Sequence, residues 1–309
     1  MKIVVTGATS FLGAVTVRQL LEKGYQVGAV VRPGSHNMSN LYKQIPKGKE
    51  QDLKIIELNL HDIEQIAEHV PAADAWIHMG WDGSGSENRK KRDVQQSNVV
   101  QSLKAVHAAN VIGCKRFLFT GSQAEYGVCN TVITEENPLN PVSEYGIAKV
   151  EFGQQAEVLC KDFGMDYIHT RIFSVYGPGD HPHSLVESCV RTWMEGGEMK
   201  LGECTQKWNY LYIEDVVSAL VSLLEKAEPG VYNIASTDVR VLREYIKEMY
   251  ELCGSRGSYV FGQRPQNAEG PANLVADISK ICEMTGWHPV TTFSEGINEL
   301  LHRMQENAS

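Results

Sequence analysis

A tyrosine and a lysine lie four residues apart in the segment Tyr145-Gly146-Ile147-Ala148-Lys149. On a helix this spacing places both side chains on one face, one turn apart. An ammonium group beside a phenol stabilises the phenolate and lowers the pKa of the tyrosine, so its hydroxyl can exchange a proton with a substrate near neutral pH. The spacing therefore indicates an acid/base site for redox chemistry, with a solvated helical pair as the alternative.

A glycine-rich segment directly follows the first predicted strand and opens the first predicted helix: Gly7-Ala8-Thr9-Ser10-Phe11-Leu12-Gly13. Glycine lets the backbone turn sharply there and lets a pyrophosphate approach the helix N-terminus. Ser10 occupies a position that is often glycine. The strand before this segment and the amphipathic helix after it favour dinucleotide binding over a plain turn. The residues expected at the cofactor are Gly7, Thr9, Ser10, Phe11, Leu12 and Gly13.

The second predicted strand ends in Val30-Val31-Arg32-Pro33 without an acidic residue. A carboxylate at this position would bind the free 2'-hydroxyl of NAD, whereas the planar guanidinium of Arg32 suits a 2'-phosphate. The sequence therefore favours NADP as the cofactor, with NAD as the alternative. A solvated arginine at the strand end is the other interpretation of Arg32.

Short β-branched runs alternate with helical patterns through the first two thirds of the chain, which predicts a parallel sheet covered on both faces. The predicted strands are 3–5, 26–31, 53–58, 75–79, 117–120, 167–173, 209–213 and 231–234. The predicted helices include 13–23, 63–69, 93–110, 145–162 and 215–226. We expect an α/β fold: a doubly wound parallel-sheet (Rossmann) domain of residues 1–176 plus 209–235, and a smaller α/β C-terminal substrate lobe of residues 177–208 plus 236–309.

Composition excludes several classes of function. The net charge of −9 argues against a nucleic-acid partner, because binding phosphates calls for a basic surface. The seven cysteines never occur as Cys-x-x-Cys, so neither a disulfide framework nor a zinc knuckle is indicated. The chain has neither a signal-peptide pattern nor eighteen consecutive apolar residues, and we expect a cytoplasmic protein without a membrane partner. His181-Pro182-His183 lacks a third ligand nearby, so no metal site is predicted.

Further motifs extend along nearly the whole chain in a fixed order. They are Ile77-His78-Met79-Gly80, Asn98, Phe119-Thr120-Gly121-Ser122, Tyr126-Gly127, Arg171 through Tyr176-Gly177-Pro178-Gly179, Tyr212-Ile213-Glu214-Asp215, Tyr232-Asn233-Ile234, Ala276-Asp277 and Gly286-Trp287-His288-Pro289. With the glycine-rich segment and the Tyr145–Lys149 pair, the chain resembles the extended short-chain dehydrogenase/reductase superfamily. Within it, the resemblance is to the branch of nucleotide-sugar epimerases, dehydratases and ketoreductases.

The resemblance implies roles for individual residues. Tyr145 would be the acid/base, Ser122 would donate a hydrogen bond to the reacting oxygen, and Lys149 would hold the nicotinamide ribose while lowering the pKa of the tyrosine. A carbonyl oxygen gains negative charge as hydride reaches its carbon, which such donors stabilise. The further cofactor residues that it implies are Asn59, Leu60, Met79, Gly80, Asn98 and Phe173. Alternatively, Met79 fills the core and Asn98 bonds to a neighbouring strand.

The residues after Ser122 bear on the reaction. The resemblance implies that dehydratases of this branch have an Asp-Glu pair directly after this position. This chain has Gln123-Ala124 there, and these two side chains cannot perform acid/base elimination of water. Glu125, one residue further on, would point elsewhere on an extended segment. The sequence favours an NADPH-dependent 4-ketoreductase of a nucleotide-linked 4-keto-6-deoxyhexose. An NAD-dependent nucleotide-sugar 4-epimerase is the main alternative, and a non-catalytic NADP-sensing protein is a remote one.

Substrate recognition departs from the family pattern. Familiar epimerases have asparagine at Ser174 and arginine at Trp208, and both help to hold the diphosphate of the sugar nucleotide. Arg264, in Gln263-Arg264-Pro265, remains as a diphosphate ligand, with Arg191 or Arg240 as substitutes. The resemblance also implies a homodimer through the helices at 93–110 and 145–162. The predicted substrate residues are Trp81, Gln123, Ser174, Trp208 and Arg264.

Overall fold

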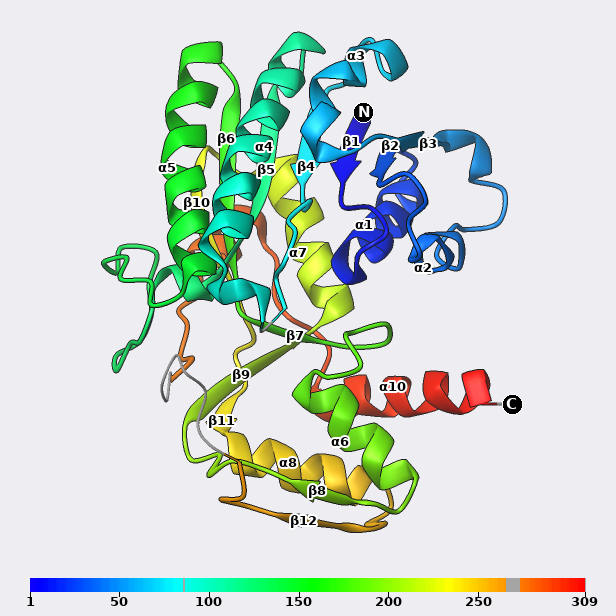
Figure 1. Ribbon diagram of the computed structural model, residues 1–309, viewed down its shortest axis with the longest axis vertical. Coiled ribbons are helices and arrows are strands. Elements are labelled where there is room, and N and C mark those ends of the chain that lie inside the picture. Colours follow the sequence, from blue (N-terminus) through cyan, green and yellow to red (C-terminus); the bar gives the residue numbers. More distant parts are fainter. Residues whose placement is uncertain (86, 265–272, 309) are drawn as a thin grey trace.

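A computed structural model describes residues 1–85, 87–264 and 273–308 of the chain (Figure 1). Its main element is a seven-stranded sheet in the order β10-β6-β5-β4-β1-β2-β3, in which every neighbouring pair is parallel. This order is that of a doubly wound sheet and confirms the predicted fold class. The strands are β1 (Lys2–Thr6), β2 (Gln26–Val31), β3 (Leu53–Glu57), β4 (Ala75–His78), β5 (Arg116–Ser122), β6 (Asp166–Ile172) and β10 (Gly230–Ile234).

Helices cover both faces of this sheet, and one buried apolar cluster lies on each face. The central strands are buried along almost their whole length, which explains their unbroken β-branched and apolar sequences. The helices are α1 (Phe11–Glu22), α2 (Met38–Tyr42), α3 (Ile66–His69), α4 (Arg92–Val111), α5 (Glu144–Phe163) and α7 (Ile213–Lys226). Short 3₁₀ turns are η1 (Glu50–Asp52), η2 (Leu60–Gln65), η3 (Asn88–Lys90) and η4 (Gln123–Glu125).

Local sequence sets the bounds of α5, the helix that carries Tyr145 and Lys149. The Ser143 side chain accepts a hydrogen bond from the backbone N–H of Gly146 and caps the N-terminus. Gly164 ends the helix with a φ of 65°, a left-handed conformation that glycine adopts without strain. Ser143 therefore fixes where α5 begins, directly before the turn with the candidate acid/base pair, and Gly164 fixes where it ends.

A second, smaller part of the molecule lies at the carboxyl ends of the parallel strands (Figure 1). Its sheets are three-stranded, in the order β11-β9-β7, and two-stranded, pairing β12 with β8. Its strands are β7 (Ser174–Tyr176), β8 (Glu198–Lys200), β9 (Lys207–Tyr212), β11 (Val239–Val241) and β12 (Ser258–Val260). The remaining helices are α6 (Leu185–Met194), α8 (Leu242–Leu252), α9 (Ser279–Thr285) and α10 (Phe293–Ala308).

The predicted strand at 209–213 therefore exists as β9, but it pairs with β7 and β11 rather than with the seven-stranded sheet. Helix α9 returns to pack against α7 and β10. The exact domain boundaries proposed from the sequence stay a prediction. Among the described residues no helix combines the length and the apolar character needed to cross a bilayer.

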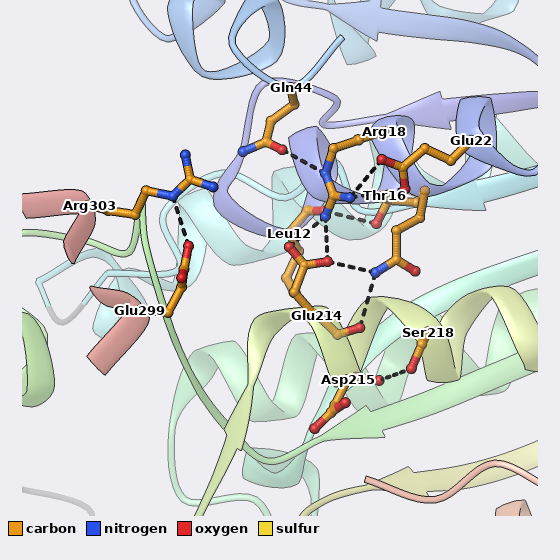
Figure 2. A network of polar contacts seen from close by, with 11 residues as sticks. Leu12, Thr16, Arg18, Glu22, Gln44, Glu214, Asp215, Ser218, Glu299 and Arg303 are labelled. Carbon is orange, nitrogen blue, oxygen red and sulfur yellow. Dashed lines mark hydrogen bonds and ion pairs between the residues drawn. The ribbon is translucent and has the colours of Figure 1, made fainter. Parts of the chain in front are cut away.

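A polar network fixes α1 against α7 (Figure 2). The Arg18 guanidinium forms an ion pair with Glu214 and donates from Nε to Gln44 over 2.8 Å. Gln19 also donates to Glu214, over 2.8 Å. Because α1 begins at Phe11, this network holds the helix whose N-terminus follows the glycine-rich turn.

Candidate active site

Two adjoining cavities of 1130 and 1240 Å³ lie at the carboxyl ends of the parallel strands, where ligands bind in open α/β sheets. They share Ser10, Asn37, Met79 and Trp81 in their walls. The smaller one, called the reaction cavity below, is lined by Phe11, Leu12, Trp81, Ser122, Tyr145, Lys149 and Phe173 among others. The larger, the adenosine-side cavity, is lined by Gly7, Thr9, Arg32, Asn59, Leu60, Gly80 and Asn98 among others.

Gly13 is the predicted cofactor residue that lines neither cavity. A Cβ atom there would lie 2.1 Å from the carbonyl oxygen of Gly7, and the Gly13 N–H donates to Ser10 Oγ over 3.0 Å. Gly7 has a φ of 73°, and a Cβ there would lie 2.9 Å from the Gly80 nitrogen. These glycines therefore make the tight turn of the segment and its close approach to β4.

Tyr145 and Lys149 lie one turn apart on α5 and both face the reaction cavity, as their spacing predicts. Both are buried, and Lys149 Nζ lies 5.5 Å from the centroid of the Tyr145 ring. Nζ also donates to the Thr120 carbonyl over 2.8 Å. Burial lowers the pKa of Lys149 to about 7; Glu125 opposes this change, and Arg89 adds to it. The amine can therefore change charge near neutral pH.

Ser122 ends β5 and also lines the reaction cavity. Its Oγ accepts a hydrogen bond from the Ala124 N–H over 3.2 Å, so the hydroxyl hydrogen is available to donate toward the cavity. Its backbone N–H donates to the Glu125 carboxylate over 2.8 Å. Glu125 thus turns back from the cavity, as expected, although the backbone there forms a 3₁₀ turn rather than an extended strand.

Trp81 and Arg89 pack against the acid/base pair. The Trp81 ring lies edge-on to Tyr145 at 6.3 Å, and the Arg89 guanidinium lies 4.2 Å from the Tyr145 ring centroid. Gln95 accepts from Trp81 Nε1 over 2.8 Å and donates to the carbonyls of Gly83 and Asn88.

Asn98 exchanges two hydrogen bonds with the backbone of Asp82, each 2.8 Å long. Asn98 therefore lines the adenosine-side cavity and also holds the backbone at Asp82, which lies in the loop after β4 and not in a neighbouring strand as the alternative from the sequence had it. Sequence reasoning missed Gln95 and Arg89. The spacing of Gln95 and Asn98, three residues apart on one face of α4, was the available signal.

Arg32 follows β2 and lines the adenosine-side cavity, with an exposed side chain. Its guanidinium lies 3.6 Å from a carboxylate oxygen of Asp82, and both side chains are 69% exposed. The nearest acid thus comes from the segment after β4, not from β2 itself. An ion pair this exposed contributes little to stability and leaves Arg32 accessible to a ligand.

The predicted substrate residues do not all gather at the reaction cavity. Trp81 lines it, but Gln123, Ser174, Trp208 and Arg264 do not. Trp208 packs near Tyr210, with ring centroids 6.3 Å apart, and Arg264 is exposed. Pro265, the next residue of that motif, lies outside the described residues.

Helix α6 with its C-cap residue, and helix α10, supply lining residues that sequence reasoning largely missed: Glu187, Arg191, Met194, Glu195, Leu300, Arg303 and Met304. Arg191 was one of two substitutes considered for a diphosphate ligand, and it lines the cavity. The other, Arg240, pairs with Asp238 and Glu248 and lines neither cavity. The rings of His181 and His183 lie 5.2 Å apart, and no metal-binding group of three or more His, Cys, Asp or Glu occurs among the described residues.

Comparison with known proteins places this geometry in a family. Residues 3–235 match the model of the NAD dependent epimerase/dehydratase family. The chain belongs to that family. This result confirms the predicted branch of nucleotide-sugar enzymes within the short-chain dehydrogenase/reductase superfamily.

Relatives in the family cover almost the entire chain. The UDP-glucose 4-epimerase of Corynebacterium glutamicum is 26% identical over 314 residues, covering 94% of this chain and 92% of that protein. The crystal structure of UDP-glucose 4-epimerase from Thermotoga maritima with UDP-glucose is 24% identical, has a TM-score of 0.90 and covers 100% of both chains. That of UDP-glucuronic acid 4-epimerase from Bacillus cereus with NAD is 21% identical, with a TM-score of 0.84, covering 99% of this chain and 97% of that one. These structures share the fold, a Rossmann domain followed by a C-terminal lobe.

Proposed function

We propose that the protein transfers hydride between a nicotinamide dinucleotide and the C4 position of a nucleotide-linked sugar, with Tyr145 as the acid/base. The observation that carries the proposal is that Ser122, Tyr145 and Lys149 all line one cavity, which adjoins the cavity at the glycine-rich turn. The tight turn at Gly7 and Gly13 places the N-terminus of α1 at these cavities, where a dinucleotide pyrophosphate can bind.

A bound nicotinamide dinucleotide would supply or accept the hydride. In the direction of reduction, Tyr145 gives its phenolic proton to the sugar oxygen as hydride reaches C4, and Ser122 donates a hydrogen bond to the same oxygen. Lys149 stabilises the phenolate left on Tyr145. In the direction of oxidation the phenolate takes the proton from the C4 hydroxyl.

The favoured net reaction is NADPH-dependent reduction of a 4-keto-6-deoxyhexose carried on a nucleotide. Arg32 supports this choice, because its exposed guanidinium lines the adenosine-side cavity at the end of β2, where no carboxylate follows the strand. A guanidinium there suits a 2'-phosphate better than a free hydroxyl. Hydride transfer at C4, the central part of the proposal, does not depend on the preference for NADP.

A 4-epimerase that recycles one bound NAD is the second candidate. Two observations favour it: Asp82 places a carboxylate 3.6 Å from Arg32, and the relatives in Corynebacterium glutamicum and Thermotoga maritima are UDP-glucose 4-epimerases. Dehydration is disfavoured. Gln123 and Ala124 carry no acid or base, and the buried Glu125 carboxylate faces His169 and Arg171 rather than the cavity.

We further propose that Trp81 and Arg191 contact the substrate from the reaction cavity, and that Gln123, Ser174, Trp208 and Arg264, which do not line this cavity, contribute to substrate binding as the family resemblance implies. We also propose a homodimer through α4 and α5. These helices pack side by side (Figure 1), and exposed valines occur on both of them.

A spectrophotometric assay with 4-keto nucleotide sugars separates the two net reactions. Sustained loss of NADPH absorbance, at more than one turnover per enzyme, supports the reductase. Interconversion of C4 epimers without net change in cofactor would replace it with the epimerase. If neither reaction occurs with any nucleotide sugar offered, hydride transfer at C4 is the wrong function.

A further inference from the structure

A buried carboxylate lies directly behind Ser122. Glu125 is fully buried, and its carboxylate accepts hydrogen bonds from the backbone N–H of Ser122 at 2.8 Å and from Arg171 Nε at 2.9 Å. His169 Nε2 lies 3.0 Å from the second oxygen and 3.1 Å from the first. Burial alone would raise the pKa of Glu125, but His169, Arg171 and the Ser122 N–H together hold it below its ordinary value. The carboxylate is therefore a fixed anion.

The hydrogen bonds around this anion define where the Ser122 hydroxyl lies. Glu125 accepts a hydrogen bond from the Ser122 nitrogen, while the Ala124 N–H, two residues further on in the same 3₁₀ turn, donates to Oγ at 3.2 Å. Both contacts belong to η4, in which Ser122 and Glu125 form a reciprocal capping box. The backbone and the side chain of Ser122 are thus each held by one contact, which limits the directions in which its O–H can point.

The same carboxylate reaches the helix of the acid/base pair through His169. The imidazole lies between two glycines: a Cβ on Gly121 of β5 would lie 2.4 Å from Nε2, and a Cβ on Gly153 of α5 would lie 2.5 Å from Cε1. Gly153 lies one turn beyond Lys149 and two turns beyond Tyr145 on α5. The His169 ring is therefore packed between β5 and the face of α5 that carries Tyr145 and Lys149.

We propose that Glu125 and His169 are positioning residues that fix the Ser122 hydroxyl and the Tyr145–Lys149 helix relative to each other. Glu125 holds Ser122 through its backbone N–H, and His169 links that carboxylate to Gly153 on α5. Neither side chain touches the substrate. A serine donor and a phenol donor on different elements thereby converge on one substrate oxygen.

Two substitutions of Glu125 weaken its contact with the Ser122 N–H in different ways. Glu125→Asp keeps the charge near Arg171 but withdraws the carboxylate by one methylene from the Ser122 N–H. Glu125→Gln keeps the side-chain length but has one acceptor oxygen, which the charged Arg171 takes, so that an NH2 group faces the Ser122 N–H. We expect Glu125→Asp to lower kcat about tenfold, because small misplacements of a catalytic group slow chemistry strongly, and to change KM less than about twofold. Glu125→Gln should lower kcat to a similar extent, because its NH2 group cannot accept from the Ser122 N–H, and it should also unfold at a lower temperature, because it leaves Arg171 buried without a counter-charge.

A double-mutant cycle with Ser122→Ala tests whether Glu125 acts through Ser122. The proposal expects Glu125→Asp to change kcat less than about twofold when Ser122 has no hydroxyl to position. An equal loss in both backgrounds would overturn it, since a general structural role lowers both rates alike. Glu135→Asp is the matched control: Glu135 also accepts a backbone N–H, from Asn233 at 2.8 Å, but lines neither cavity, and kcat should not change.

The kinetic tests of this inference rest on the proposed function, because they need turnover. An NMR measurement needs no turnover and therefore tests the inference separately. In protein labelled with ¹⁵N-serine, the Ser122 amide proton should shift upfield in Glu125→Asp, while the amide of Ser143 at the start of α5 moves less. An unchanged Ser122 resonance overturns the proposal even if the enzyme is active. If wild-type protein turns over no nucleotide sugar but Ser122 shifts as expected, the proposed function fails and the positioning role stands. If Glu125→Asp does not fold, the cycle is run with Glu125→Gln, whose loss of kcat must likewise shrink to less than about twofold in the Ser122→Ala background, and an equal loss in both backgrounds would overturn the proposal.

Discussion

The ammonium group of Lys149 lies 4.0 Å from the ring centroid of Trp81, inside the reaction cavity. Phe119 provides a second ring face at 4.4 Å, and the Thr120 carbonyl accepts a hydrogen bond from Nζ. Ring faces attract a cation but compensate its loss of hydration only in part. The amine is therefore held where its charged form is costly, beside the phenol that it is expected to activate.

The free energy of unfolding should depend on pH because the charged form of Lys149 is destabilised in the folded protein. In the folded protein the pKa of Lys149 is about 7, whereas in an unfolded chain it is about 10.4. Above pH 7 the unfolded state binds one more proton than the folded state, so the free energy of unfolding rises with pH, by at most about 1.4 kcal/mol per unit.

We expect this rise between about pH 7 and 8.5, below the range in which thiols titrate in the unfolded chain. Buried thiols such as Cys114 and Cys160 have raised pKa values and give the opposite slope at higher pH. Urea unfolding of wild type and Lys149→Met at several pH values measures the effect. The variant should lack the rise, and the same slope in both proteins would contradict a depressed Lys149 pKa.

Removing the phenolic hydroxyl should abolish proton transfer and leave the fold intact. We expect Tyr145→Phe to lower kcat by about 10²–10⁴-fold, the range typical of a positioned general acid or base. Binding of the cofactor should change little, because the ring and Lys149 remain. Tyr250→Phe is a suitable control, since that hydroxyl bonds the carbonyls of Ser255 and Gly257 outside both cavities. Near-full activity of Tyr145→Phe would refute the proposed mechanism.

Arg32 and Asp82 should act in opposite directions on cofactor choice. Arg32→Ala should weaken NADP binding about tenfold or more, because charge-assisted hydrogen bonds contribute about 1.5–3 kcal/mol, and it should leave NAD binding nearly unchanged. Asp82→Asn removes the carboxylate 3.6 Å from the guanidinium and should strengthen NADP binding. Titrations with both cofactors measure the two effects. Equal losses for NAD and NADP in Arg32→Ala would remove the main support for the reductase.

Much of the site could be predicted because its residues follow directly from strand ends and helix periodicity. Ser122 ends β5, the glycine-rich turn follows β1, and Tyr145 and Lys149 share a face of α5 by spacing alone. In a parallel sheet these strand ends meet at one edge, so contacts across more than a hundred residues of sequence could be anticipated.

The rest depended on packing that sequence patterns do not specify. The contribution of α6 and α10 to the reaction cavity requires knowing that two distant pieces of chain line the same cavity as Phe11 and Leu12 of α1. The sequence places Trp208 among the substrate residues, and only its tertiary neighbours show that it packs beside Tyr210. Likewise, Glu125 bonds to residues of β6, which lie more than forty residues further along the chain.

Arg191 is the arginine of α6 that faces the reaction cavity, and we expect it to bind the substrate diphosphate. Arg191→Ala should raise KM for the nucleotide sugar about tenfold, since a charge-assisted hydrogen bond contributes about 1.5–3 kcal/mol, with a small change in kcat. The KM for the cofactor should stay the same. The exposed Arg256, which lines neither cavity, provides the control Arg256→Ala. A loss confined to kcat would show that Arg191 contacts the sugar in the transition state instead.

Exposed apolar side chains on α4 and α5 predict the dimer interface. Val100 and Val111 are 58% and 71% exposed on α4, and Ile147 and Val158 are 40% and 59% exposed on α5. Each pair is eleven residues apart, about three helical turns, so each pair lies on one face of its helix. Two copies of the α4–α5 pair would bury these side chains in a four-helix arrangement.

Light scattering should find a dimer for the wild type and a monomer for Val100→Glu combined with Val158→Glu. Val290→Glu, at an 80% exposed position in the turn before α10, should leave the dimer intact, and a monomeric wild type would exclude this interface.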